Sequence, residues 1–282
     1  MGGNYKMTGP KSPAQILDTA IDVGVGKGNS SFAKLAILGI FGGAFIALAA
    51  QGSTMAAFNL LSDPSSYGLG RMVSGAVFAV GLIMVCLAGA ELFTGNCLMI
   101  TSTLEKKLSV GKLLRNWIIV YIFNLIGGIF IAWLMAETGL FGAGGNMVGA
   151  LTVKIAAGKT ALPFGSAFIL GILCNWLVCL AVWLNFGADT MLGKMMGIFF
   201  PIWLFVTSGF EHSVANMYYI PAGLFAKANE AFVSLSGATP DALASLTWSG
   251  FFVNNLIPVT LGNLVGGGLF VAMAYWFVYK KA

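Results

Sequence analysis

Six long apolar runs constrain this chain more than any other feature of its sequence. A helix needs about 20 mostly apolar residues to cross the roughly 30 Å hydrocarbon core of a bilayer, because it rises about 1.5 Å per residue. Of the 282 residues, 58% are hydrophobic and only 9% are charged, too few to cover a water-exposed surface. We predict six membrane-spanning helices, at roughly 32–50, 73–104 with an interruption, 117–136, 167–186, 195–217 with an interruption, and 251–279.

The chain divides into an N-terminal segment, 1–31, and a single transmembrane domain, 32–282. Some thirty mostly polar residues precede the first apolar run, which is too long a stretch for a cleaved signal, so we expect the N-terminus to be retained. Ser12 is a good helix cap, Pro13 suits a first turn, and apolar residues recur as far as Ile21. This segment predicts an amphipathic surface helix, better suited to an interfacial anchor than to a gate.

The basic residues are distributed unevenly between the two sides of the predicted membrane. With six spans, the terminal side holds eleven lysines and arginines and the other side holds four. The eleven are Lys6, Lys11, Lys27, Lys34, Lys106, Lys107, Lys112, Arg115, Lys194, Lys280 and Lys281, and the four are Arg71, Lys154, Lys159 and Lys227. Since positive loops stay cytoplasmic, we predict cytoplasmic termini in a multi-pass protein of a bacterial inner membrane. The net charge of +5 therefore needs no nucleic-acid partner.

The second half of the chain repeats the first. Three short patterns recur in the same order, in repeats of about 32–136 and 167–279. They are Ile-Leu-Gly-Ile at 37–40 and 169–172, Gly-x-Glu-x-x-x-(Gly or Ala)-Asn at 89–96 and 209–216, and Asn-Leu-(Ile or Val)-Gly-Gly at 124–128 and 263–267. Because each repeat has an odd number of spans, the second must cross the membrane upside down relative to the first. We predict an all-α fold of two inverted three-helix repeats.

Spans two and five each carry a glutamate inside a glycine-rich stretch. A carboxylate at that depth costs roughly 3 kcal/mol or more, and irregular backbone is tolerated there only inside protein or beside a wet cavity. We predict that both helices break at Glu91 and Glu211, and that these carboxylates structure the breaks by accepting hydrogen bonds from the N–H groups of their own loops. Half-helices restarting there would aim their positive ends at the centre, which favours anions.

His212 is the only histidine and lies at the second break, where an ionisable side chain usually faces a pathway. It could donate a hydrogen bond or lend a proton. Thr94, Asn175 and Asn263 are candidate neutral donors, although the two asparagines could equally join helices. The four cysteines lie in apolar runs, so we expect no disulfide and no metal site, and the sequence predicts no cofactor.

These residues resemble the formate/nitrite transporter family, which also contains hydrosulfide channels. The resemblance covers nearly the whole chain, with its longest motifs at 89–94, 208–217 and 255–263. Glu-Leu-Phe-Thr-Gly-Asn-Cys at the first break is most similar to the hydrosulfide branch. We therefore favour a channel for hydrosulfide among small monovalent anions, with formate or nitrite, carried by a channel or with a proton, as alternatives.

The resemblance implies an aquaporin-like protomer, a homopentamer, and one pore through each protomer. It implies two apolar constrictions, Phe78, Leu82 and Phe205 on the cytoplasmic side and Leu92, Phe93 and Val178 on the outer side. His212 would lie in the chamber between them, with Thr94, Asn175 and Asn263 lining it or holding its loops. Lys159 would draw anions into an outer vestibule. Without the family, these apolar residues would pass as lipid or helix contacts, and Lys159 as a loop lysine.

Two other classes of protein fit the sequence less well. An enzyme needs a polar catalytic cluster, and the predicted loops contain no histidine, no cysteine pair and few carboxylates. A structural membrane protein without transport activity would have no use for costly ionisable side chains at the membrane centre.

Overall fold

The computed structural model describes residues 9–282, and every regular element in that part of the chain is a helix. The first eight residues, which include Lys6 of the charge count and the start of the predicted segment 1–31, lie outside the described residues.

Six helices in the described residues are long and apolar enough to cross a bilayer, as predicted. They are α2 (Phe32–Ser62), α3 (Tyr67–Ile83) continued by η1 (Met84–Gly89), α5 (Val110–Glu137), α7 (Phe164–Gly187), α8 (Met191–Ser208), and a last helix made of η4 (Gly250–Leu256), α12 (Ile257–Gly267), η5 (Gly268–Met273) and α13 (Ala274–Lys280). Between and before them lie α1 (Pro13–Gly28), η2 (Gly95–Met99), α4 (Ile100–Leu104), η3 (Leu140–Gly142), α6 (Met147–Thr160), α9 (Ser213–Ala226), α10 (Glu230–Ser236) and α11 (Pro240–Ser245).

The first span extends twelve residues beyond its predicted end near residue 50. The polar residues that suggested an end there point into the protein instead. Gln51 accepts a hydrogen bond from the Tyr218 hydroxyl at 2.5 Å, and Ser53 donates to the Ser74 carbonyl at 2.9 Å. Because the Gln51 Oε1 and the Ser53 hydroxyl are bonded inside the protein, the helix can continue through these residues.

Helix α1 begins as predicted: Ser12 is the N-cap, Pro13 is the first helical residue, and Ser12 and Gln15 form a capping box. Its apolar face does not face lipid. Leu17 and Ile21 are fully buried, and the Ser102 hydroxyl donates to the Ile21 carbonyl at 2.7 Å. The N-terminal helix is therefore packed onto the transmembrane helices.

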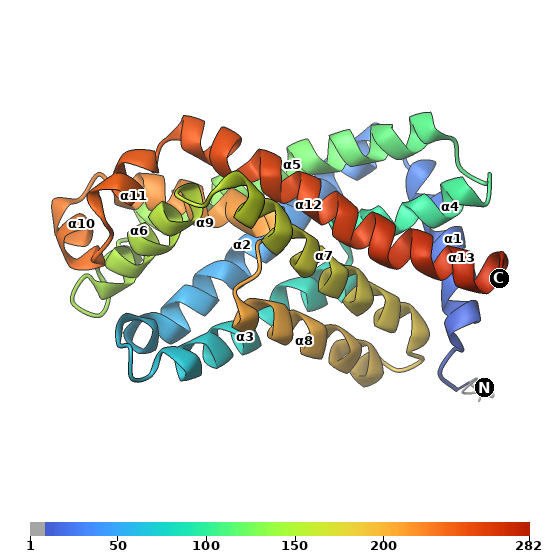
Figure 1. Cartoon of the computed structure of the whole chain (residues 1–282), viewed down its shortest axis with the longest axis horizontal. Helices are drawn as coiled ribbons and strands as arrows, with labels where there is room; N and C mark the ends of the chain where they lie inside the picture. The colour runs from blue at the N-terminus through green and yellow to red at the C-terminus, as the bar shows by residue number, and fades with distance from the viewer. Residues whose placement is uncertain (1–8) are drawn as a thin grey trace, which may run out of the picture.

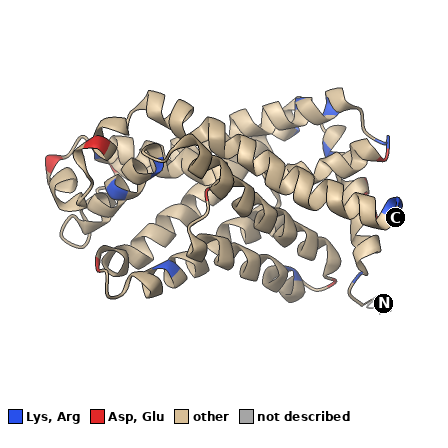
Figure 2. Ribbon diagram, in the orientation of Figure 1, with Lys and Arg blue, Asp and Glu red and all other residues tan. Residues whose placement is uncertain are grey.

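The two halves of the chain form two copies of one motif, inverted relative to each other. Helix α2 packs along α5 as α7 packs along α12. Helices α3 and α8 pack against each other and against α2 and α7, on the side away from α5 and α12 (Figure 1). The N-terminus and the C-terminus lie at one end of the molecule, whereas α6, α10 and α11 form the other end. Charged residues gather toward these two ends, and the band between them is almost uncharged apart from an acidic position on the loop joining α8 to α9 (Figure 2).

Glycines let the crossing helices approach closely. A methyl group at Gly127 would overlap the carbonyl oxygen of Ile40, and one at Gly266 would overlap that of Ile172. These pairs belong to the matched patterns of the two repeats. Each repeat therefore has a glycine at this position because two helix backbones touch there and leave no room for a side chain.

Candidate pore at the two helix breaks

Both predicted interruptions are confirmed. The second span stops at Gly89 and regular structure resumes at Gly95, while the fifth stops at Ser208 and resumes at Ser213. Gly89 and Gly209 adopt φ angles of 96° and 83°, a left-handed conformation that glycine enters without steric cost. The glycine two residues before each glutamate therefore sets the position of the break.

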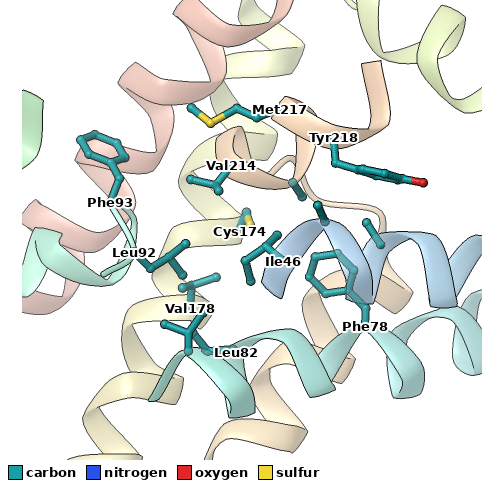
Figure 3. Close-up of a cluster of buried hydrophobic side chains, with 14 of the residues drawn as sticks. Ile46, Phe78, Leu82, Leu92, Phe93, Cys174, Val178, Val214, Met217 and Tyr218 are labelled. Atoms are coloured by element: carbon teal, nitrogen blue, oxygen red, sulfur yellow. The ribbon is translucent and has the colours of Figure 1, made fainter. Parts of the chain in front are cut away.

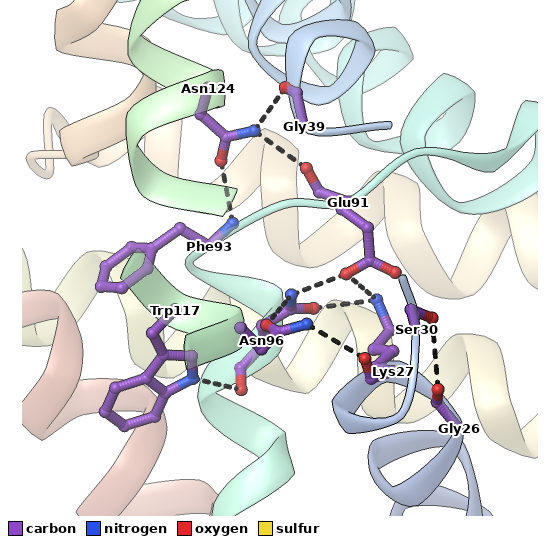
Figure 4. A network of polar contacts seen from close by, with 10 residues as sticks. Gly26, Lys27, Ser30, Gly39, Glu91, Phe93, Asn96, Trp117 and Asn124 are labelled. Atoms are coloured by element: carbon purple, nitrogen blue, oxygen red, sulfur yellow. Dashed lines mark hydrogen bonds and ion pairs between the residues drawn. The ribbon is translucent and has the colours of Figure 1, made fainter. Parts of the chain in front are cut away.

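Each buried glutamate at a break pairs with a lysine from a helix that precedes its repeat. In the first break, Lys27 Nζ lies 2.9 Å from Glu91 Oε2 (Figure 4). In the second, Lys159 Nζ lies 2.6 Å from Glu211 Oε1. Neither glutamate side chain accepts a hydrogen bond from a described backbone N–H group, so the donors predicted from the loops were wrong. The negative charge is balanced by an ammonium group instead.

Asparagines complete the first of these ion pairs. Asn96 Nδ2 donates to Glu91 Oε2 at 2.7 Å and to Asn116 Oδ1 at 2.9 Å. Asn116 in turn donates to the carbonyl of Lys27 at 3.4 Å. The carboxylate, the ammonium group and two amides thus form one closed polar network (Figure 4).

The second break has a similar network, with one difference: Asn255 also donates to Glu211 Oε2, at 3.2 Å, and no described lysine bonds to Asn216 Oδ1 as Lys27 does to Asn96 Oδ1. Asn216 Nδ2 donates to Glu211 Oε2 and to Asn255 Oδ1, both at 2.7 Å, and Asn255 donates to the carbonyl of Lys159 at 3.0 Å. The repeat therefore begins earlier than the predicted residue 32, because α1 with Lys27 corresponds to α6 with Lys159.

A third asparagine in each half holds the backbone of the loop. Asn124 Nδ2 donates to the carbonyls of Gly39 at 2.7 Å and Glu91 at 2.9 Å, and its Oδ1 accepts from the N–H of Phe93 at 3.0 Å. One amide side chain thus replaces the backbone bonds that the broken helix has lost.

Asn263 has the same part in the second half. It donates to the carbonyls of Gly171 at 2.8 Å and Glu211 at 3.0 Å, and accepts from Ser213 N–H at 2.9 Å. Asn175 joins the first break to α12, since its Nδ2 donates to the carbonyls of Thr94 at 3.2 Å and Asn263 at 2.7 Å. These contacts give both asparagines a loop-holding position.

His212 and Thr94 meet where the two breaks approach each other. His212 Nδ1 accepts from Ala215 N–H at 2.9 Å and so caps α9, while Nε2 lies 3.0 Å from Thr94 Oγ1. With Nδ1 acting as the acceptor, the neutral ring carries its proton on Nε2 and donates to Thr94. When the two repeats are aligned on Glu91 and Glu211, His212 corresponds to Leu92 and Thr94 corresponds to Val214. Each of these two polar side chains thus has an apolar counterpart in the other break.

Two pockets approach this centre from opposite ends. We call the first the Lys159 pocket; it has a volume of about 330 Å³ and reaches His212. The second, the Lys27 pocket, has a volume of about 480 Å³ and ends at Glu91 and Leu92. No pocket found in the described residues runs through from one to the other.

The structure regroups the six apolar residues that the resemblance assigned to constrictions. Phe78 and Phe205 line the Lys159 pocket and lie edge to face, with ring centroids 5.7 Å apart. Leu82 and Leu92 line the Lys27 pocket and gather with the buried Val178 (Figure 3). The predicted grouping of Leu82 with the two phenylalanines was wrong, because Leu82 lies one helical turn further along α3.

Phe93 lies away from both pockets. Its ring packs edge-on against Tyr121 at 4.8 Å and Trp117 at 6.2 Å, and it lines an apolar groove between α5 and α12. It points away from Leu92 and Val178 (Figure 3). Successive residues in an extended loop point in opposite directions, so Leu92 and Phe93 cannot both face the pore.

The sequence interpretation missed the lysine of the first network. Lys27 precedes Gly39 by twelve residues, as Lys159 precedes Gly171, so extending the comparison of the two halves upstream would have found the pair. Asn96 and Asn216 were part of the repeated pattern but were given no role. Arg71, which lines the Lys159 pocket, was noted only for its charge.

Six spanning helices in two inverted repeats, two of them broken around closed polar networks, define a multi-pass membrane transport protein. The match of residues 14–277 to the model described as "Formate/nitrite transporter" shows that the chain belongs to the formate/nitrite transporter family.

Relatives with assigned names are transport proteins. The chain is 42% identical over 295 residues to the "Probable formate transporter" of Methanothermobacter thermautotrophicus, covering 100% of both chains. It is 35% identical over 271 residues to the "Formate channel FocA" of Escherichia coli (strain K12), covering 95% of this chain and 94% of that one. A solved "Pentameric formate channel with formate bound" matches with a TM-score of 0.78 and 40% identity, over 89% of this chain and 98% of the other.

The Lys159–Glu211 pair predicts a large effect on stability. Lys159→Met leaves a buried carboxylate without its counter-charge, which should lower the free energy of unfolding by about 3 to 5 kcal/mol. Adding Glu211→Gln should restore part of that loss. Thermal unfolding of the purified protein in detergent measures both, with Lys154→Met, an exposed lysine on the same helix, as the control. Equal effects of the two lysine substitutions would contradict a structural role for the pair.

Proposed function

We propose that this chain is a selective membrane channel for small monovalent anions, and that formate is its principal substrate. The observation that carries the proposal is the Thr94–His212 pair, buried between two pockets that each contain a lysine and each end at apolar side chains. An anion that enters either pocket meets walls that offer it few replacements for water.

The apolar walls account for selectivity by charge. Leu82, Leu92 and Val178 on one side, and Phe78 and Phe205 on the other, strip water from a passing ion. A monovalent anion with a small hydration energy can cross such a barrier, while sulfate, with two charges to desolvate, is rejected.

His212 and Thr94 supply the polar contacts at the centre. The Nε2–H of the neutral ring, or the Thr94 hydroxyl, can turn from its partner to an anion. Protonation of Nδ1 would remove the acceptor of the Ala215 N–H at the start of α9. A protonated ring, with a proton on both nitrogens, therefore lacks this cap. When it gives a proton to the substrate, which then crosses as the neutral acid, the ring returns to the neutral form in which Nδ1 can again accept from Ala215 N–H.

The names of the relatives favour formate over the hydrosulfide that the first-break sequence suggested. Formate occurs in the names of the archaeal and bacterial relatives and in that of the structural neighbour. Hydrosulfide and nitrite, also small and monovalent, are candidates that the same barrier would pass.

A homopentamer with cytoplasmic termini is the assembly we propose. The similarity to a solved channel described as pentameric supports the number of subunits. Large apolar side chains exposed on one protomer, such as Phe200 and Leu204 on α8, are available to be covered by lipid or by another subunit. The excess of basic residues on the terminal side supports the orientation.

The purified protein in proteoliposomes provides the direct test. We expect formate, hydrosulfide and nitrite to cross, formate fastest, and sulfate to be excluded. Empty liposomes correct for passive diffusion of formic acid and hydrogen sulfide. Equal rates for sulfate and formate would refute the apolar barrier, and the absence of any anion flux would refute the channel.

His212→Phe tests the central imidazole. It fills a similar space but has no donor or proton, so the pH dependence of formate flux should be abolished or strongly altered. Initial rates between pH 5 and 8 measure this, and Thr94→Val, which removes only the hydroxyl partner, is compared over the same range. An unchanged pH profile at a normal rate would exclude histidine from the mechanism.

The native cysteines test the orientation. Cys86 lines the Lys27 pocket, whereas Cys97, Cys174 and Cys179 are buried. If the termini are cytoplasmic, a small, permanently charged thiol reagent should label inverted membrane vesicles and not intact cells. Cys86→Ser is the control and should remove the label. Labelling of Cys86 in intact cells would reverse the proposed orientation.

A further inference from the structure

The C-terminal end of α8 opens onto the Lys159 pocket. Gly209 N–H bonds to the carbonyl of Phe205 at 3.1 Å, and Phe210 N–H bonds to the same carbonyl at 3.2 Å, so the helix closes in a tight final turn. Phe205, Val206 and Gly209 line the pocket. The last carbonyls of a helix carry a partial negative charge of roughly half an electron. Left alone, this end would repel an anion approaching Phe78 and Phe205.

Arg71 reaches these carbonyls from the neighbouring helix α3. Its Nε donates to the carbonyl of Thr207 at 3.2 Å, and its Nη2 donates to that of Val206. Two reciprocal bonds fix the register of α3 and α8, from Thr207 Oγ1 to the Arg71 carbonyl at 3.5 Å and from Trp203 Nε1 to the Met72 carbonyl at 2.8 Å. The guanidinium group is therefore held against the end of α8.

The other cations of this pocket contribute less net charge at the barrier. Lys159 is neutralised by Glu211 at 2.6 Å. Lys154 is exposed, so water and salt screen it. Among the described carboxylates, none forms an ion pair with Arg71. The positive charge that faces the pocket without a compensating carboxylate nearby is thus that of Arg71.

The corresponding place in the other half lacks such a residue. By the register of Glu91 and Glu211, Met191 is the equivalent of Arg71, and it is exposed. The equivalent carbonyls are those of Cys86 and Leu87, and no described lysine or arginine side chain donates to them. A break of this kind therefore forms without a guanidinium group, and Arg71 is an addition to one mouth of the pore.

We propose that Arg71 is an anion-selecting residue at the Lys159 mouth. Its guanidinium group cancels the negative end of α8 and leaves the approach to Phe78 and Phe205 positive. Arginine suits this position because its planar fork can bond two carbonyls at once and stays charged at every pH at which the protein works. In a pocket with apolar walls, such a charge is focused onto the passing ion. This inference rests on the proposed anion channel.

The test is the anion-to-cation permeability ratio, obtained from reversal potentials in planar bilayers containing the purified protein with sodium formate gradients. Arg71→Gln should lower the ratio about tenfold, the low end of what a focused charge gives. Arg71→Lys, which keeps the charge, should restore most of it. Lys154→Gln, an exposed cation in the same pocket, is the matched control and should change the ratio less than twofold. A structural role alone would change the conductance and leave the ratio unaltered.

If Arg71→Gln does not fold, Arg71→His takes its place. As the pH is raised from 5.5 to 8, the anion-to-cation permeability ratio of this variant should fall by more than that of the wild type, because the introduced imidazole loses its charge. A normal ratio in Arg71→Gln, or a pH dependence in Arg71→His equal to that of the wild type, would overturn this inference while leaving the channel intact. A wild-type protein that conducts no anion would instead refute the proposed function.

Discussion

The structure depends on satisfying polar groups in the middle of a bilayer. Breaking a spanning helix frees backbone donors and acceptors where no water is at hand, and each unpaired group there costs several kcal/mol. Asn124 and Asn263 take over those bonds, and the Lys27–Glu91 and Lys159–Glu211 pairs anchor the two breaks to α1 and to α6. The breaks are therefore held in place by side chains from both ends of each repeat.

The duplicated frame and the pore differ in kind. The asparagines, glutamates, lysines and close-packed glycines occur in both halves and hold the backbone. The side chains that we propose to meet the permeating ion are those in which the halves diverge. His212 and Thr94 correspond to Leu92 and Val214, and Arg71 corresponds to Met191. The shared residues thus build the scaffold, and in the proposed mechanism the differences between the halves give the pathway a proton-bearing centre and one positive mouth.

The order of groups along the pathway explains how a channel can be selective without a deep binding site. In the proposed channel, the cationic mouth at Arg71 concentrates anions, and the apolar walls then exclude those that hold water too strongly. His212 Nε2 and the Thr94 hydroxyl are already bonded to each other, so an anion must compete for their protons and would be bound only weakly. Weak binding at the centre permits rapid release.

The sequence by itself determined the six spans, the inverted repeat, the two breaks and the central position of His212. Long apolar runs and a glutamate between glycines allow few structures in a bilayer, and these signals are local in sequence. Only the tertiary structure decided the partners. Lys27 reaches Glu91 across 64 residues and Arg71 reaches Val206 across 135. It also decided that Leu82 and Phe78 belong to different pockets and that Phe93 leaves the pore. Which side of a helix faces a pathway depends on the packing of helices distant in sequence, and apolar residues that line a pore have the same composition as those that face lipid.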